Sequence, residues 1–172
     1  NDLHLSAQEN IKLDQHIENV YMGLKNGILD QSAILLSRAS HLTTINCRDY
    51  THKVIPPPWL GSNAPVKFML AFSGIRQPLA ATPGYNMRVD ECRSAARILQ
   101  TAVSRPDDPA LLGTFTIEEF DTHRELLDNE CLRRAEHFFG ECQRVQQGVE
   151  AWSAGDMVTF GKLMSQSGES SI

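Results

Sequence analysis

The sequence predicts an α+β fold in which two helices and a strand pair precede a helix-rich segment. Three observations lead to this prediction. Apolar residues recur at helical spacing before residue 37, alternating runs follow between residues 42 and 55, and helical spacing returns from residue 86 onward. With 172 residues and 41% apolar content, the chain has enough apolar side chains for a core.

Two helices joined by a turn are predicted at the start of the chain. Ser6-Ala7-Gln8-Glu9 fits a capping box, and the apolar residues that follow keep helical spacing as far as Leu24. A turn containing Gly23 and Gly27 ends this helix. A second, shorter helix is predicted over residues 30–37.

A strand pair is predicted next. Residues 42–47 and 50–55 alternate enough to form a hairpin, and Pro56-Pro57-Pro58 marks its end because proline cannot donate to a ladder. Residues 66–72 predict a third, largely buried strand. Residues 73–78 form the loop that leaves this strand, and such loops commonly carry ligand contacts.

The remainder of the chain is predicted to be helical. Four helices follow from apolar spacing and from their end signals. They are Asn86 to the proline-containing turn at 105–109, residues 117–127, Leu132 to Trp152 ending at Gly155, and residues 157–164 capped by Asp156.

Composition and charge exclude several classes of function. The net charge is −5 and both signs are interspersed, so no basic stripe predicts a nucleic-acid partner. No apolar run approaches the roughly 20 residues that span a bilayer, and the start of the chain lacks the layout of a signal peptide. We therefore expect a soluble, cytoplasmic chain without a membrane partner, and its start at Asn1 suggests a fragment.

The four cysteines are expected to be reduced. Cys47, Cys92, Cys131 and Cys142 show no C-x-x-C spacing, and the last two are too far apart on one predicted helix to form a disulfide. Each is expected to be a small buried side chain rather than a nucleophile or metal ligand.

The segment Asn26-Gly27-Ile28-Leu29-Asp30-Gln31 is the best sequence clue to function. It places the Asp30 carboxylate just after a glycine, where a polar turn gives way to an apolar helix. There the carboxylate lies near backbone N–H groups and the positive end of the helix dipole, so it stays ionised and can accept a proton. Taken alone, the pattern is more typical of a capped turn than of a catalytic site.

Four segments change that interpretation, because they resemble elements of one enzyme family and occur in that family's order. They are Gly27-Ile28-Leu29-Asp30-Gln31, similar to G-I-M-D-Q; Ile75-Arg76-Gln77-Pro78-Leu79, similar to V-R-H-x-L; Pro83-Gly84-Tyr85-Asn86-Met87-Arg88 with Glu91-Cys92, similar to E-Y-N-x-R with Q-C; and Arg134-Ala135-Glu136-His137 with Gly161-Lys162-Leu163-Met164, similar to R-A-x-H-V with G-x-L-M. The chain thus resembles the GHMP sugar kinases nearly end to end. Within their galactokinase-like members, it is more similar to galacturonokinases than to galactokinases.

The resemblance implies a reaction that moves the γ-phosphoryl group of ATP onto the anomeric hydroxyl of a sugar, with Mg2+ as the second cofactor. Asp30 matches the catalytic base of such kinases. Glu18, twelve residues earlier, matches the acidic residue that binds Mg2+, and one carboxylate with water and phosphate oxygens is sufficient for that ion. Apart from the resemblance, Glu18 fits an ordinary polar helix face with Gln15 and Asn19.

The resemblance also implies a sugar pocket. Tyr85 matches a tyrosine that contacts the sugar, and a phenol can both donate to and accept from hydroxyls. Its residue pattern alone also fits simple packing beside the Pro83-Gly84 turn. Asn26 and Gly27 lie in the same turn as Asp30, so they are expected to line the pocket.

An acidic sugar needs a cation near its carboxylate. Arg76 is the first candidate, because it follows a predicted buried strand into a loop and its planar fork can bind a carboxylate bidentately. Arg88 and Lys25 are the other candidates, but exposed helix cations are usually solvated.

Three elements expected of such a kinase are missing from the chain. They are an N-terminal Arg near the transferred phosphoryl group, a Gly/Ser-rich phosphate loop and a late Gly-rich loop. We therefore expect the chain to carry the catalytic carboxylate without the elements that hold ATP, and to be inactive alone. Gln77 and Gly168 stand where histidines are expected in the family, and both changes favour the galacturonate-type enzyme.

The resulting prediction is a chain made of two partial domains of the GHMP kinase type. Residues 1–60 are expected to close the N-terminal domain and to carry Asp30, and residues 61–172 to begin the helix-rich C-terminal domain. The expected function is ATP-dependent phosphorylation of D-galacturonic acid at its anomeric position. The alternatives are a galactokinase, a non-catalytic sugar-binding or regulatory module, and an unrelated helical scaffold.

Overall fold

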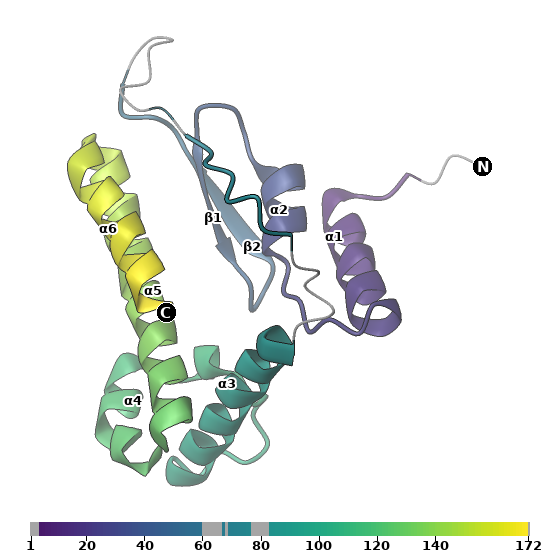
Figure 1. The fold of residues 1–172 in the computed structure, drawn as a ribbon, viewed down its shortest axis with the longest axis vertical. Helices are drawn as coiled ribbons and strands as arrows, with labels where there is room; N and C mark the ends of the chain where they lie inside the picture. Colours follow the sequence, from purple (N-terminus) through teal and green to yellow (C-terminus); the bar gives the residue numbers. More distant parts are fainter. Residues whose placement is uncertain (1–3, 60–66, 68, 77–82, 172) are drawn as a thin grey trace. The chain divides into compact units, whose positions relative to one another are not determined.

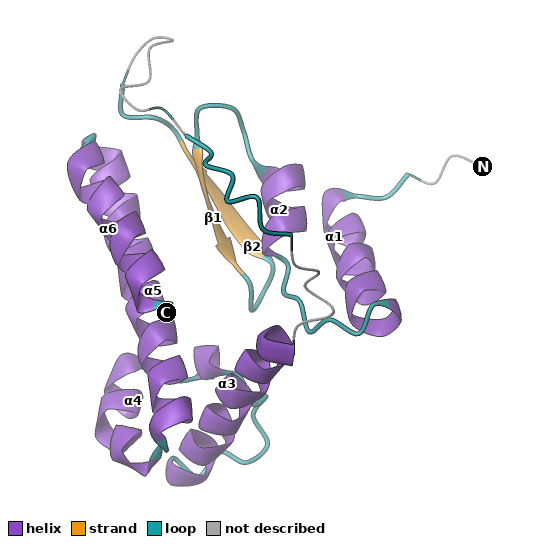
Figure 2. Cartoon of the chain, viewed as in Figure 1, coloured by secondary structure: helices purple, strands orange, loops and turns teal. Residues whose placement is uncertain are grey.

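The computed structural model describes residues 4–59, 67, 69–76 and 83–171 (Figure 1). Two compact units are present. Unit 1 comprises Asn1–Thr82 with Gly148–Gly161, and unit 2 comprises Pro83–Gln147 with Lys162–Ile172. The described residues form helices and a two-stranded sheet, which confirms the α+β class (Figure 2). The division into kinase domains at residue 60 stays a prediction.

Unit 1 begins with the predicted pair of helices. Helix α1, Ala7–His16, starts at a capping box in which the Ser6 hydroxyl accepts from the Glu9 N–H and the Glu9 carboxylate accepts from the Ser6 N–H. The helix continues as a π-helical turn, Ile17–Tyr21. Gly23 follows with φ +68°, a conformation that a side chain would strain. Helix α2, Leu29–Leu36, then begins close to its predicted position.

The predicted hairpin is also confirmed. Strand β1, Leu42–Asn46, pairs antiparallel with β2, Thr51–Ile55, in a register that places Leu42 opposite Ile55. The turn between them is closed by Asp49, whose Oδ1 accepts from the Thr51 N–H at 2.9 Å and from its hydroxyl at 2.6 Å. The hairpin therefore depends on local polar contacts at its turn.

The prediction of a third, largely buried strand over 66–72 is wrong for the part of it that the structure describes. Lys67 and residues 69–72 belong to no strand, and the side chains of Met69, Leu70 and Phe72 are 89%, 82% and 91% exposed. Val66 and residue 68 lie outside the described residues. An apolar run becomes a strand only where a neighbour takes its backbone hydrogen bonds, and the described sheet contains only β1 and β2.

Trp152 connects the end of a long helix to the segment that follows the hairpin in unit 1. It lies near the end of helix α5, Asn129–Ala154, and its indole N–H donates to the Pro56 carbonyl at 2.9 Å. Its ring also meets Trp59 edge-on, with centroids 5.0 Å apart. Gly155, at φ +73°, ends α5 as predicted. Helix α6, Met157–Ser170, follows the predicted cap at Asp156.

The core of unit 2 lies between three helices. They are α3, Pro83–Ala102, α4, Ile117–His123, and the first part of α5. Leu99 is fully buried in this core, and the rings of Phe120 and Phe139 stack with centroids 4.6 Å apart. The predicted helix over 117–127 ends as an α-helix at His123 and continues as a 3-10 turn, Arg124–Leu126.

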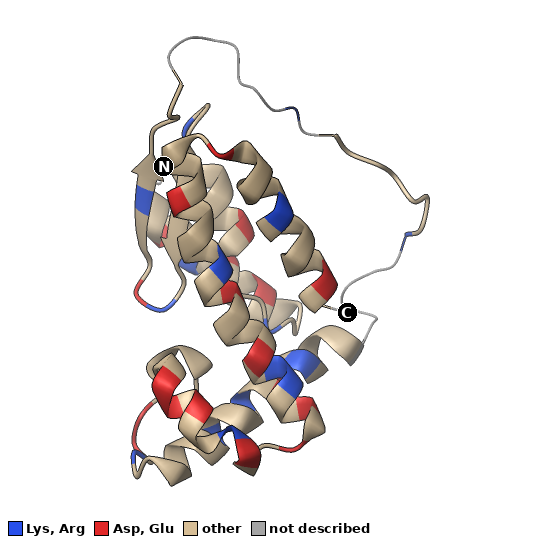
Figure 3. Ribbon diagram, turned by 90° about the vertical axis from the view of Figure 1, so that its left-hand side faces the viewer, with Lys and Arg blue, Asp and Glu red and all other residues tan. Residues whose placement is uncertain are grey.

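Charges of both signs lie on the same helices. Figure 3 shows Lys and Arg in blue and Asp and Glu in red, interspersed along the ribbon. This arrangement agrees with the mixed charge pattern of the sequence. None of the helices in the described ranges is long and apolar enough to cross a membrane.

Acid should destabilise both units. Hydrogen bonds from Thr51 lower the pKa of Asp49, and a hydrogen bond from the backbone N–H of Thr116, the N-cap residue of α4, lowers the pKa of Glu119. Because these folded-state pKa values lie below the unfolded values near ~4, the carboxylates stabilise the fold above pH ~4 and lose that effect as pH falls through the folded pKa. We expect a constant melting temperature from pH 7 to about 5 and a decrease below about pH 4.5. Circular dichroism melts at constant ionic strength measure this, and an unchanged melting temperature at pH 3 would contradict it.

Candidate functional site

The Glu18 carboxylate is the centre of a hydrogen-bond cluster in unit 1. Its Oε2 accepts from the Asn26 side-chain amide at 3.0 Å and from the Gln31 side-chain amide at 2.9 Å. Glu18 comes from the π-helical turn, Asn26 from the loop that follows it, and Gln31 from α2. These two bonds therefore tie the loop and the start of α2 to the end of the first helix. We call these three residues the Glu18 cluster.

Apolar side chains support the cluster from within unit 1. Ile11, Leu24 and Ile28 are 2%, 6% and 2% exposed. The Leu24 N–H also donates to the Glu18 carbonyl at 3.1 Å, which turns the chain sharply after the π-helical turn. Burial of the apolar residues on either side of Asn26 thus holds its polar side chain close to Glu18.

Asp30 lies in the first turn of α2 and its side chain is exposed. The N-cap of this helix is Ile28, and no side chain caps it. Within the described part of the chain, the Asp30 carboxylate forms no hydrogen bond or ion pair. The structure thus does not use Asp30 as a helix cap, and the carboxylate is accessible for proton transfer beside Gln31 of the cluster.

Gly27, three residues before Asp30, leaves open space at its own position. A Cβ atom added there would meet nothing within 4 Å, and the glycine is not in the left-handed conformation. The chain's own packing therefore does not require glycine at this position. A bound molecule would benefit from the space, because a close backbone approach needs the missing side chain.

The other predicted pocket residues are not members of the Glu18 cluster. Arg76 is exposed in a segment of unit 1 without regular structure, and no hydrogen bond among the described residues joins it to Glu18, Asn26 or Gln31. Gln77 lies outside the described residues. Tyr85 belongs to unit 2, where it is half-buried in the first turn of α3.

Glu18 is suited to hold Mg2+ as a single carboxylate. Among the described residues, no group of three or more His, Cys, Asp and Glu side chains is placed to bind a metal ion. Both amide donors reach Oε2 of Glu18, and no described residue donates to Oε1. Magnesium commonly takes one or two carboxylates with water and phosphate oxygens, and hydrogen-bonded neighbours orient such ligands. The donor set therefore fits this ion.

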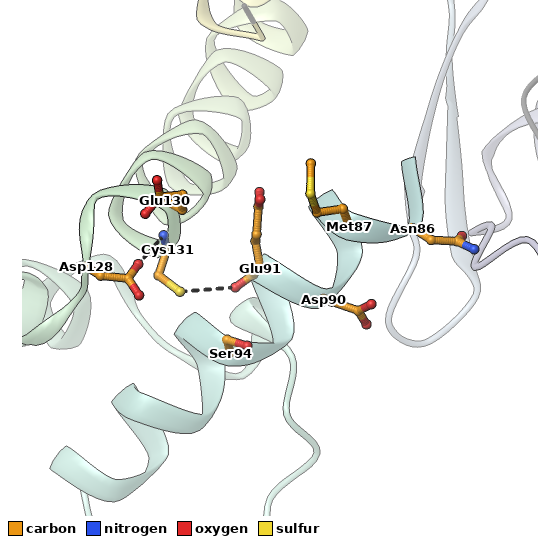
Figure 4. A pocket seen from close by; sticks show the side chains of 8 residues that line it. All are labelled: Asn86, Met87, Asp90, Glu91, Ser94, Asp128, Glu130 and Cys131. Atoms are coloured by element: carbon orange, nitrogen blue, oxygen red, sulfur yellow. Dashed lines mark hydrogen bonds between the residues drawn. The ribbon is translucent and has the colours of Figure 1, made fainter. Parts of the chain in front are cut away.

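Unit 2 contains a pocket of about 660 Å3 between α3 and the start of α5 (Figure 4). Four carboxylates line it, those of Asp90, Glu91, Asp128 and Glu130. The surplus of negative charge disfavours ATP or a sugar acid in this pocket. Burial raises the pKa of the Cys131 thiol at its edge to about 11, so that thiol stays protonated and unreactive at neutral pH.

Comparison with known proteins connects the chain to one family. No family model matches it. Galacturonokinase from Arabidopsis thaliana is 46% identical over 172 residues, which are 100% of this chain and 40% of that protein. Galactokinase from Roseiflexus sp. is 35% identical over 167 residues, 97% of this chain and 40% of that protein. The chain belongs to the galactokinase-like sugar kinases of the GHMP family.

A solved structure agrees with this assignment to the galactokinase-like kinases. Lactococcus lactis galactokinase, complexed with galactose, matches 96% of this chain and 40% of its own at a TM-score of 0.72 and 29% sequence identity. The resemblance inferred from four sequence segments is thereby confirmed. The chain spans about 40% of the length of the curated relatives it matches.

Sequence reasoning missed part of this kinase segment. It singled out Asp30 and Glu18 but gave no role to Gln31, although Gln31 belongs to the same G-I-L-D-Q element. It also treated Gln15 as part of a polar helix face. In the sequence, Gln15 and Gln31 are ordinary polar residues of two helices. Their hydrogen bonds reach residues 11 and 13 positions away, so sequence spacing alone does not reveal these contacts.

Proposed function

We propose that the chain is the segment bearing the catalytic base of an ATP-dependent kinase that phosphorylates D-galacturonic acid at its anomeric hydroxyl. One observation carries the proposal. Asp30 is an exposed carboxylate in the first turn of a helix, unpaired within the described part of the chain and adjacent in sequence to Gln31 of the hydrogen-bonded Glu18 cluster. The higher identity to galacturonokinase than to galactokinases supports the acidic sugar as substrate.

In this proposal, Asp30 takes the proton of the anomeric hydroxyl as its oxygen attacks the γ-phosphorus of ATP. The new O–P bond forms while the bond from the γ-phosphorus to the β,γ-bridging oxygen breaks, and ADP leaves with that electron pair. Glu18 would hold Mg2+ with its carboxylate. When bound, this ion neutralises charge on the phosphate oxygens.

The sugar is proposed to lie beside Gly27, where the backbone leaves space. Asn26 shapes this side of the pocket, because both its carbonyl and its side-chain amide are held by hydrogen bonds to Gln15 and Glu18. Tyr85 is proposed to hydrogen-bond a sugar hydroxyl. Arg76 is proposed to pair with the carboxylate that distinguishes galacturonate from galactose.

Replacement of Arg76 by Gln should change the choice of sugar. We expect kcat/KM for galacturonate to fall about 10–100-fold, from the ~1.5–3 kcal/mol of a hydrogen bond to a charged group, and kcat/KM for galactose to change less than about threefold. The measurement is steady-state kinetics with both sugars, and Arg133→Gln, at an exposed position of α5, is the matched control. Equal losses for the two sugars would count against carboxylate recognition by Arg76.

The function itself is tested in a polypeptide of the relatives' length that contains this chain, called the longer polypeptide below. With ATP and Mg2+, it should form a sugar 1-phosphate from galacturonate, detected by phosphorus NMR, whereas the 172-residue chain alone should show no turnover. A preference for galactose would identify a galactokinase. Sugar binding without phosphorylation would indicate a non-catalytic module and overturn the proposal.

A further inference from the structure

A row of hydrogen bonds runs through unit 1 from the hairpin turn to the loop before Asp30. The Tyr50 hydroxyl donates to Oε1 of Gln15 at 2.9 Å, and Nε2 of Gln15 donates to the Asn26 carbonyl at 3.3 Å. The Asn26 side chain then donates to Glu18. Tyr50 and Gln15 are 35 residues apart in sequence, and Gln15 and Asn26 are 11 apart, so the row joins three separate segments.

Tyr50 and the Asn26 carbonyl contact opposite sides of the Gln15 amide. An amide side chain presents an oxygen on one side and an NH2 group on the other, and rotation by half a turn exchanges them. With the Tyr50 proton directed at Oε1, Nε2 faces the Asn26 carbonyl and can donate to it. The opposite orientation would set the Gln15 oxygen against the Asn26 carbonyl oxygen, which is unfavourable. The Asn26 carbonyl, which can only accept, thus selects this orientation, and the Tyr50 hydroxyl supports it by donating to the oxygen on the other side of the amide.

Tyr50 is itself held in place. Its backbone adopts φ +62°, in the left-handed region that residues other than glycine seldom occupy. The Lys12 ammonium lies 5.3 Å from the centroid of its ring, and the residue is half-buried. The turn conformation of the hairpin is thus coupled to the position of the phenol oxygen.

We propose that Tyr50 and Gln15 are positioning residues for the turn that carries Asp30, an inference that rests on the proposed function. Asn26 is held at two points, its carbonyl by Gln15 and its side chain by Glu18, and the second point also fixes Gln31 next to Asp30. Removal of the first point frees the Asn26 carbonyl from Gln15 and leaves its side chain bonded to Glu18. Displacement of a reacting group by about 1 Å can cost as much as ~100-fold in rate, so this attachment matters for proton transfer.

Replacement of Tyr50 by Phe tests the proposal, because it removes only the hydroxyl. In the longer polypeptide, we expect kcat with the sugar to fall about 3–30-fold while KM for ATP changes less than about twofold. Tyr21→Phe is the matched control, since Tyr21 is 78% exposed in the same unit and should leave kcat unchanged. A loss confined to KM for ATP, or equal kcat values in the two variants, would overturn the positioning role.

Gln15→Met and the double variant separate positioning from general destabilisation. Gln15→Met removes the same link, so adding Tyr50→Phe to it should cause no further loss of kcat. Independent, additive losses would contradict a shared pathway through Gln15. If Tyr50→Phe fails to fold, the comparison of Gln15→Met with Tyr21→Phe decides the question with the same expected values.

Hydrogen exchange distinguishes failure of this inference from failure of the proposed function. Amides of residues 22–28 should exchange about tenfold faster in Tyr50→Phe than in the parent or Tyr21→Phe, while amides of α3 stay unchanged. This readout needs no kinase activity. An inactive parent enzyme would refute the proposed function alone, whereas unchanged exchange in residues 22–28 would refute the link from Tyr50.

Discussion

Asp30→Asn is expected to lower kcat for sugar phosphorylation about 100- to 10,000-fold, the range of general-base catalysis. Asn keeps the size of the side chain but cannot accept the hydroxyl proton. Because the Asp30 carboxylate is exposed and unpaired among the described residues, the substitution should leave the melting temperature unchanged. Steady-state kinetics and thermal melts of the longer polypeptide measure both quantities.

Two further variants are needed to interpret the effect of Asp30→Asn on kcat. Asp107→Asn alters an exposed carboxylate of unit 2 and should retain the parent kcat. Glu18→Gln should instead raise the Mg2+ concentration needed for half-maximal rate, because it removes the charge that attracts the ion while keeping an acceptor for the Asn26 and Gln31 amides. An Asp30→Asn enzyme that keeps more than about a tenth of the parent kcat would exclude Asp30 as the base.

Phe120→Ala should cause the largest loss of stability in unit 2, about 3–5 kcal/mol. Phe120 is 2% exposed, and its ring stacks on Phe139 in the core between α3, α4 and α5. Removal of the ring loses its transfer free energy and leaves a cavity that the helices cannot fill completely. Urea unfolding followed by circular dichroism measures the free energy of unfolding.

Phe72→Ala is the matched control for this substitution. Phe72 is 91% exposed, so its removal should change the free energy of unfolding by less than about 0.5 kcal/mol. Similar losses of unfolding free energy for both variants would show that Phe72 is buried in solution, as expected for the strand predicted over residues 66–72. A loss below about 1 kcal/mol for Phe120→Ala would contradict the packing of unit 2.

Elements with local causes were predicted well from sequence. The capping box at Ser6, the end of α5 at Gly155 and the hairpin β1–β2 all depend on residues close to one another in the chain. The predicted strand over 66–72 failed because its formation requires a partner strand from elsewhere. Apolar spacing carries no information about whether such a partner is present.

The same distinction applies to the candidate site. The order of its motifs in the sequence determined the family. Asp30 lies in one of these motifs, and Glu18 was singled out by its position twelve residues earlier, on the predicted helix before that motif. Only the tertiary structure showed that Glu18 holds Asn26 and Gln31, and that Tyr50 reaches the same loop through Gln15. The physical reason is the range of the interactions. A cap or a turn is decided within a few residues, whereas a hydrogen bond across 35 residues exists only after packing has brought its two ends together.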